Sequence, residues 1–142
     1  AYGGLANGGV AVKPVALTNL VRDSGETLWS PMLDRHQAVS AQGAYLATSL
    51  LKGVLDRGTG SKARVWGLRG PVAGKTGTTD GYRDAWFVGY TGNFSCAVWY
   101  GNDDYSPTNR MTGGSLPAIT RSTKPEATMN SSSTDTCLRP SE

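Results

Sequence analysis

The residues of this chain best suited to chemistry form a short run, Lys75-Thr76-Gly77-Thr78-Thr79. Threonine hydroxyls can donate hydrogen bonds to a carboxylate, and a lysine ammonium adds positive potential beside them. A glycine inside a strand allows another backbone to approach closely. This combination of groups suits an acyl-transfer site that binds a carboxylate-bearing substrate.

The same lysine also ends a glycine-rich stretch, residues 70–76, that resembles a phosphate-binding loop. A true P-loop has four residues between its glycines, and it opens a helix whose N-terminus holds the phosphate. Here three residues lie between Gly70 and Gly74, and the following Gly77-Thr78-Thr79-Asp80-Gly81 favours a helix poorly. We therefore expect a strand at this place and no nucleotide site.

The side chains of a strand alternate between its two faces, which divides the run into two sets. Lys75, Gly77 and Thr79 then face one way. Thr76 and Thr78 face the other way. A twist or a bulge at Gly77 is therefore expected, because only such an irregularity would bring the lysine and the two threonines to one site.

The first half of the chain predicts a helix end, a hairpin and a long helix. Residues 1–9 are typical of a helix that stops at glycines. Residues 10–22 and 26–29 predict a hairpin around Asp23-Ser24-Gly25. Apolar residues at helical spacing predict an amphipathic helix over 34–56, capped by Asp34 or Ser40. Its expected apolar stripe consists of Val39, Gly43, Leu46, Ala47, Leu50, Leu51, Val54 and Leu55.

Three strands are predicted after this helix. Residues 68–79 contain the first, and residues 84–90 and 95–101 form a hairpin around Thr91-Gly92-Asn93. The order of elements shows no βαβ alternation, so we expect an α/β protein of the α+β kind, with an antiparallel sheet packed by helices. The aromatic residues expected in its core are Trp86, Phe87, Trp99 and Tyr100.

Five stretches of the chain carry a recognisable pattern: Leu5–Val10, Leu50–Val54, Arg57–Gly60, Ala73–Thr79 and Asp84–Tyr90. Together they resemble the C-terminal half of the transpeptidase domain of class A, bifunctional penicillin-binding proteins. Met111–Ala118 is also similar to the closing segment of that family. The resemblance implies a β-lactamase/transpeptidase-like fold and an incomplete domain over residues 1–119.

In that family the motifs Ser-x-x-Lys, Ser-x-Asn and Lys-Thr-Gly meet at one cleft. The serine attacks the D-Ala-D-Ala end of a peptidoglycan stem peptide, and the amine of a second stem resolves the acyl-enzyme into a cross-link. β-Lactams acylate the same serine. The resemblance implies that Lys75 and Thr78 are catalytic, Lys75 by supporting the second motif's hydroxyl and the Thr78 N–H as an oxyanion donor. It also implies that Thr76, Gly77 and Thr78 bind substrate.

The chain departs from the family pattern at the other two motifs. A Ser-x-x-Lys string occurs at residues 49–52, but it lies within the predicted structural helix. We interpret Ser49 as helix surface, because the family nucleophile lies far upstream of this helix. No Ser-x-Asn occurs in the chain. We expect both motifs to precede Ala1, together with a glycosyltransferase domain and a membrane anchor, in a parent protein on the periplasmic face of the inner membrane.

Composition excludes several other functions for these 142 residues. The net charge is +3 without a Lys/Arg run, so no nucleic acid partner is expected. No apolar stretch is long enough to span a membrane. His36 is the only histidine, and we expect it to be solvated near a helix start, with no metal site and no cofactor. Cys96 and Cys137 are expected to be ordinary thiols, and Arg83 and Asp84 a solvated ion pair.

The last 23 residues, 120–142, differ in composition from the rest. Ten of them are Ser or Thr and four are apolar, so the segment predicts a disordered tail.

Two other functions remain open. One is a fragment of a β-lactamase-type serine hydrolase, and the other is a non-catalytic remnant of the fold. The Asn-Gly-Gly segment and the long hairpin after it favour the transpeptidase over the hydrolase.

Overall fold

The centre of the fold is a four-stranded antiparallel sheet with the order β5-β6-β7-β8. The computed structural model describes residues 1–123 and 134–138. The strands are β5 (Ala73–Thr78), β6 (Asp84–Tyr90), β7 (Ser95–Gly101) and β8 (Thr134–Leu138). This mixture of helices with an antiparallel sheet confirms the predicted fold class, and the hairpin of β6 and β7 lies where it was predicted.

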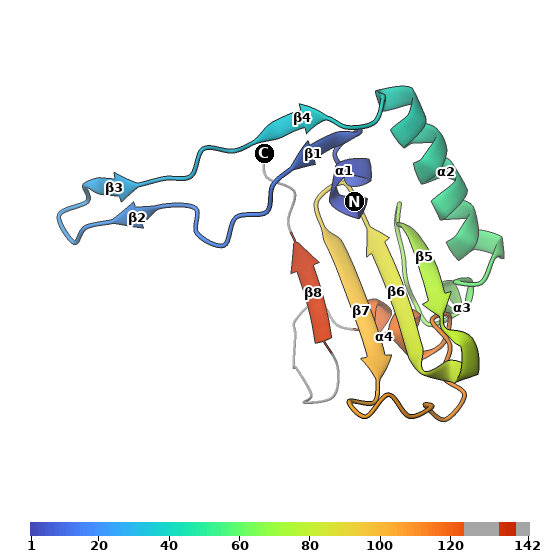
Figure 1. Cartoon of the computed structure of the whole chain (residues 1–142). Helices are drawn as coiled ribbons and strands as arrows, with labels where there is room; N and C mark the ends of the chain where they lie inside the picture. The colour runs from blue at the N-terminus through green and yellow to red at the C-terminus, as the bar shows by residue number, and fades with distance from the viewer. Residues whose placement is uncertain (124–133, 139–142) are drawn as a thin grey trace.

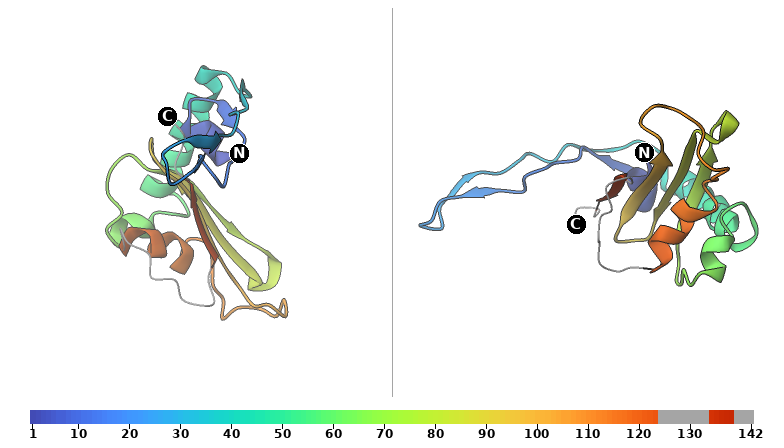
Figure 2. Two further views of the ribbon diagram at one scale, coloured as in Figure 1. Left: turned by 90° about the vertical axis from the view of Figure 1, so that its left-hand side faces the viewer. Right: turned by 90° about the horizontal axis from the view of Figure 1, so that it is seen from below.

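The described residues form four α-helices next to the sheet, with bounds α1 (Tyr2–Ala6), α2 (Ala41–Arg57), α3 (Lys62–Val65) and α4 (Leu116–Thr123). Helix α2 runs alongside β5, and α1 lies on one face of the sheet (Figure 1). The rings of Tyr2 and Tyr90 meet edge to face there at 6.1 Å. Helices α3 and α4 lie on the opposite face (Figure 2). The short α3 has no counterpart in the sequence prediction.

The hydrophobic core lies between the sheet and the layer formed by α3, α4 and the end of α2. Leu55 and Phe87 are its largest members, with 0% and 1% of their surfaces exposed. The other members are Ala63, Leu68, Val72 and Ala118. Phe87 is therefore in the core as predicted, whereas the prediction for Trp86 is wrong, because 42% of its surface is exposed. Neighbouring strand residues point to opposite faces, and α3 and α4 cover only the Phe87 face.

Helix α2 begins at Ala41, and Ser40 caps it by accepting a hydrogen bond from the N–H of Gly43 at 3.2 Å. The alternative cap, Asp34, is excluded because residues 35–37 form a strand. The predicted stripe is only partly right. Leu55 is buried, whereas Leu50 is 77% exposed, because the buried face of the helix runs through Ala44 and Leu55.

A two-stranded arm projects from the body of the molecule (Figure 1). It contains two short antiparallel pairs rather than two continuous strands, with the turn at Gly25 as predicted, where φ is +86°. His36 is exposed as expected, but it lies in a strand opposite Ala11 and not at a helix start. The pairs are β1 (Val10–Val12) with β4 (Arg35–Gln37), and β2 (Leu20–Val21) with β3 (Thr27–Trp29).

The C-terminal segment differs from the expected disordered tail. Helix α4 extends to Thr123, and residues 134–138 form strand β8, paired with β7. Cys96 lies opposite Cys137 in this pairing, and Cys96 is disulfide-bonded, so the prediction of an ordinary thiol there is wrong. β-Branched threonines in residues 134–138 favour an extended conformation. The rest of the predicted tail, 124–133 and 139–142, lies outside the described residues.

Within the described ranges, no helix is long and apolar enough to cross a membrane. The same ranges contain no group of three or more potential metal ligands.

Candidate functional site

The lysine-threonine-glycine run forms β5, which is an edge strand of the described sheet. Its pairing with β6 is regular from Ala73, opposite Tyr90, to Thr78, opposite Ala85. The register does not shift at Gly77, so the expected bulge is absent from this pair. The strand placement excludes the P-loop alternative, which requires a helix after the lysine.

The backbone of β5 presents alternate groups to the open edge. The N–H of Thr79 donates to the carbonyl of Asp84 at 3.0 Å, and these two residues continue the β5–β6 register. Hydrogen-bonded positions alternate along an antiparallel pair, so the backbone groups of Gly74, Thr76 and Thr78 point away from β6. The outer edge therefore carries the N–H groups of Thr76 and Thr78, where a further extended chain can pair.

Lys75 reaches this edge through its side chain. The ammonium donates to the carbonyl oxygen of Thr76 at 2.7 Å, and this carbonyl is one of the groups that point away from β6. The side chain leaves the strand on the face opposite the threonines, but its four-carbon stem bends back to the edge. The flexible stem thus brings the charge to the threonine backbone without any irregularity in the strand.

The hydroxyls of Thr76 and Thr78 lie on the other face and are both held in place. The Oγ1 atoms of Thr76 and Thr59 are 2.6 Å apart. The Thr78 Oγ1 accepts a hydrogen bond from the N–H of Gly113 at 3.1 Å. Since a hydroxyl that accepts a bond keeps its own proton, Thr78 can still donate to a carboxylate at the edge.

Two glycines allow the segment before α4 to cross this face. A Cβ on Gly113 would lie 2.1 Å from the carbonyl oxygen of Trp86 and 2.4 Å from that of Gly77. A Cβ on Gly114 would lie 2.2 Å from the carbonyl oxygen of Thr59. Any side chain at these positions would push the segment away from β5. Glycine is thus required for the N–H of Gly113 to reach Thr78.

The contacts of Thr59 and Gly113 were missed by the sequence prediction. Both residues fall in stretches that carry the family resemblance, Arg57–Gly60 and Met111–Ala118, so the signal was present. Spacing alone could not place either residue next to β5, because the hydrogen bonds span 17 and 35 residues.

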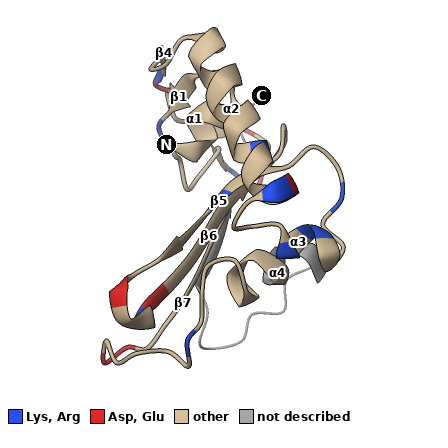
Figure 3. Cartoon of the chain, turned by 90° about the vertical axis from the view of Figure 1, so that its right-hand side faces the viewer, with Lys and Arg blue, Asp and Glu red and all other residues tan. Residues whose placement is uncertain are grey.

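Arg83 and Asp84 lie in the turn after β5 and at the start of β6. The predicted ion pair between them is wrong, because none joins them in the described residues. Asp84 accepts hydrogen bonds from the indole N–H of Trp99 at 2.9 Å and from the hydroxyl of Thr79 at 3.2 Å. The guanidinium of Arg83 instead lies 4.7 Å from the ring centroid of Tyr105. Asp84 therefore anchors the end of β5 to β7. Figure 3 shows the acidic residues at this end of the sheet.

Ser49 and Lys52 lie in α2, as expected for the helical Ser-x-x-Lys string. Ser49 is exposed, and no hydrogen bond in the described part of the chain joins either residue to β5. The structure thus brings Lys75, Thr76, Gly77 and Thr78 together and leaves Ser49 apart from them.

Comparison with known proteins gives one consistent family. The family model described as the penicillin binding protein transpeptidase domain matches residues 1–121. Penicillin-binding protein 1A of Clostridium acetobutylicum is 40% identical over 114 residues, which are 80% of this chain and 14% of that protein. The chain thus spans about a seventh of the length of this relative.

Solved structures agree with this result. The D,D-transpeptidase domain of a peptidoglycan glycosyltransferase from Eggerthella lenta is 37% identical, with a TM-score of 0.52 over 61% of this chain and 21% of that one. Penicillin-binding protein A from M. tuberculosis, solved as an imipenem acyl-enzyme complex, is 25% identical, with a TM-score of 0.61 over 84% of this chain and 28% of that one. The chain therefore belongs to the transpeptidase-domain family of penicillin-binding proteins, and its curated relatives are of the class A, 1A and 1B type.

Proposed function

We propose that this chain supplies the Lys-Thr-Gly wall of a D,D-transpeptidase cleft, and that the complete protein cross-links peptidoglycan stem peptides through an acyl-serine. The observation that carries the proposal is the edge of β5. There the ammonium of Lys75 donates to the outward carbonyl of Thr76, and the N–H of Thr78 points to the same edge.

The edge fits the needs of acyl transfer at a peptide. An extended stem peptide can pair with the outward backbone groups of β5 as an added strand. The N–H of Thr78 then donates to the oxygen that becomes negative when the carbonyl is attacked. One such donor typically lowers the barrier by about 2.7–4 kcal/mol.

The side chains of the run complete the proposed roles. The hydroxyls of Thr76 and Thr78 bind the terminal carboxylate of the substrate, and Gly77 leaves space for its backbone. Lys75 supplies positive potential to the hydroxyl of the Ser-x-Asn motif. The nucleophilic serine and its base come, in this proposal, from the Ser-x-x-Lys and Ser-x-Asn motifs of a complete transpeptidase domain.

The proposed partners are the D-Ala-D-Ala stem peptide and β-lactams, without a cofactor, a metal or a nucleic acid. The imipenem acyl-enzyme of penicillin-binding protein A supports β-lactam binding by this fold. We also propose that the complete protein is membrane-anchored and extracytoplasmic, at the periplasmic face of the inner membrane. We propose that residues 1–119 form the transpeptidase part, which the family match over 1–121 supports.

The chain alone is expected to form no covalent adduct with a β-lactam. Acylation needs a serine within hydrogen-bond reach of its base, and Lys75 alone is neither nucleophile nor complete base. Intact-mass measurement after incubation with penicillin checks this expectation. A stoichiometric adduct on any serine would contradict it, and an adduct on Ser49 would make the helical Ser-x-x-Lys string functional.

A chimera tests the role of Thr78. In it, residues 1–118 replace the aligned segment of the Clostridium acetobutylicum penicillin-binding protein 1A. Thr78→Val keeps the shape of the side chain and removes a hydrogen bond to a charged carboxylate, which is worth about 1.5–3 kcal/mol. We expect kcat/KM for acylation by a stem-peptide substrate to fall roughly tenfold or more.

Thr18→Val, in the exposed arm, is the matched control for this variant and is expected to leave the rate unchanged. If Thr78→Val acylates as fast as the unmodified chimera, the Thr78 hydroxyl does not bind the substrate.

A further inference from the structure

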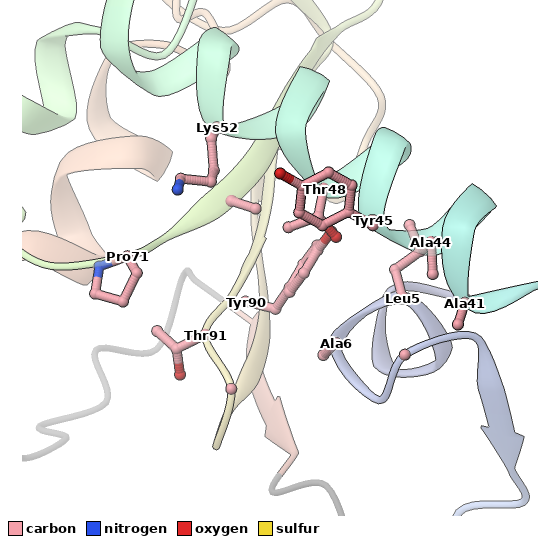
Figure 4. Close-up of a pocket in the computed structure, with 13 residues that line it drawn as sticks. Leu5, Ala6, Ala41, Ala44, Tyr45, Thr48, Lys52, Pro71, Tyr90 and Thr91 are labelled. Atoms are coloured by element: carbon pink, nitrogen blue, oxygen red, sulfur yellow. The ribbon is translucent and has the colours of Figure 1, made fainter.

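A second site is suggested by a groove at the end of β5 farthest from Thr78. Its volume is about 340 Å³, within the range of small-molecule sites. The groove lies between α1, α2 and the ends of β5 and β6 (Figure 4). It is lined by Ala73 of β5 but by none of Lys75, Thr76, Gly77 or Thr78. It is therefore distinct from the proposed substrate edge.

The groove changes in polarity along helix α2. Ala41, Ala44, Thr48 and Lys52 follow one another at spacings of three and four residues, so they share one face of the helix. Eleven residues separate the first from the last, which is about 16 Å along the helix axis. Leu5 and the alanines make one end apolar, and Lys52 makes the other end cationic.

Two hydroxyls lie between the apolar and the cationic ends. The Oγ1 of Thr48 and the phenolic oxygen of Tyr90 are 2.9 Å apart. One hydroxyl donates this hydrogen bond, and the hydroxyl that accepts it keeps its own proton, which can be donated to a ligand. Thr48 lies four residues, about one helical turn, before Lys52, and both line the groove (Figure 4).

The ammonium of Lys52 has no carboxylate partner in the described part of the chain. The ion pairs there join Arg22 to Glu26 and Arg64 to Asp56. A single cation at one end of an apolar groove, one helical turn from a hydroxyl donor, is complementary to a ligand with one negative charge and an apolar body. An uncharged apolar ligand would leave Lys52 unused, and a doubly charged head would exceed its single charge.

We propose that this groove binds a single-chain amphiphilic carboxylate, such as a fatty acid. The acyl chain lies against Leu5, Ala41 and Ala44, and the carboxylate accepts hydrogen bonds from Lys52 and from the hydroxyl pair. The proposed binding uses no residue of the Lys-Thr-Gly edge, so it stands or falls independently of the transpeptidase proposal.

Binding can be measured with the whole chain and decanoate labelled with ¹³C at the carboxyl carbon. The label is followed by NMR below the concentration at which decanoate forms micelles, and decan-1-ol serves as the uncharged competitor. We expect saturable binding of decanoate and weaker binding of decan-1-ol. Lys52→Met should weaken decanoate binding about fivefold, as for an exposed ion pair, and leave decan-1-ol unchanged.

Two further variants separate the parts of the site. Lys62→Met, on α3 and outside the groove, should bind decanoate as the unmodified chain does. Ala41→Trp replaces a small exposed residue at the apolar end and should abolish the binding of both ligands. Equal binding of decanoate and decan-1-ol, an unchanged affinity in Lys52→Met, or no saturable binding of decanoate would each overturn the proposal.

Discussion

Leu55→Ala is expected to lower the free energy of unfolding by about 3 kcal/mol, within the usual range for such changes. Leu55 is fully buried and shares its core cluster with Phe87. Truncation removes apolar contacts and leaves a cavity between α2 and the sheet. Since domains are stable by only about 5–15 kcal/mol, a loss of this size is a large fraction of the total. Urea denaturation followed by circular dichroism measures it.

The matched control is Leu50→Ala, five residues earlier in the same helix. Leu50 is 77% exposed, so its truncation should change the unfolding free energy by less than about 0.5 kcal/mol. The comparison tests which face of α2 is buried. Equal losses in the two variants, or a larger loss in Leu50→Ala, would mean that the face of α2 that carries Leu50 is buried as well.

The apolar pattern of α2 predicted that a helix forms, but it did not predict which face of the helix is buried. Leu46, Leu50 and Leu55 all fit a helix, so the existence of α2 and the cap at Ser40 could be predicted. The pattern could not decide between faces, because this helix carries apolar residues on both. Tertiary contacts determine which face of α2 is buried, because they bury Leu55 against Phe87 and leave Leu50 exposed.

The strand that carries the candidate site was predictable, but the geometry of the site was not. The run at residues 75–79 was assigned to a strand, and β5 confirms this as far as Thr78. The expected bulge at Gly77 is absent. It was expected because side-chain alternation places Lys75 and the threonines on opposite faces of the strand. The flexible stem of Lys75 brings its ammonium to the threonine backbone without a bulge. The partners of the threonines, Thr59 and Gly113, come from distant segments that no local rule connects to the strand.

The C-terminal segment contains a strand that its composition did not predict. Low apolar content predicted disorder from residue 120 onward, yet residues 134–138 form strand β8 along β7. Pairing on an existing sheet edge supplies backbone hydrogen bonds that do not depend on apolar side chains. The state of Cys96 depends on the same pairing, since its disulfide requires a partner brought close by the fold.

The role of the β5 edge is tested most directly by labelling the chimera with a fluorescent penicillin. The unmodified chimera should be labelled on one serine. Lys75→Met keeps the stem and removes the ammonium beside Thr76. We expect the labelling rate to fall about a hundredfold or more, as for the loss of one preorganised electrostatic group in an active site. Lys62→Met should label at the unmodified rate. A folded chimera that is not labelled, or an unchanged rate in Lys75→Met, would contradict the assignment of this edge to the transpeptidase cleft.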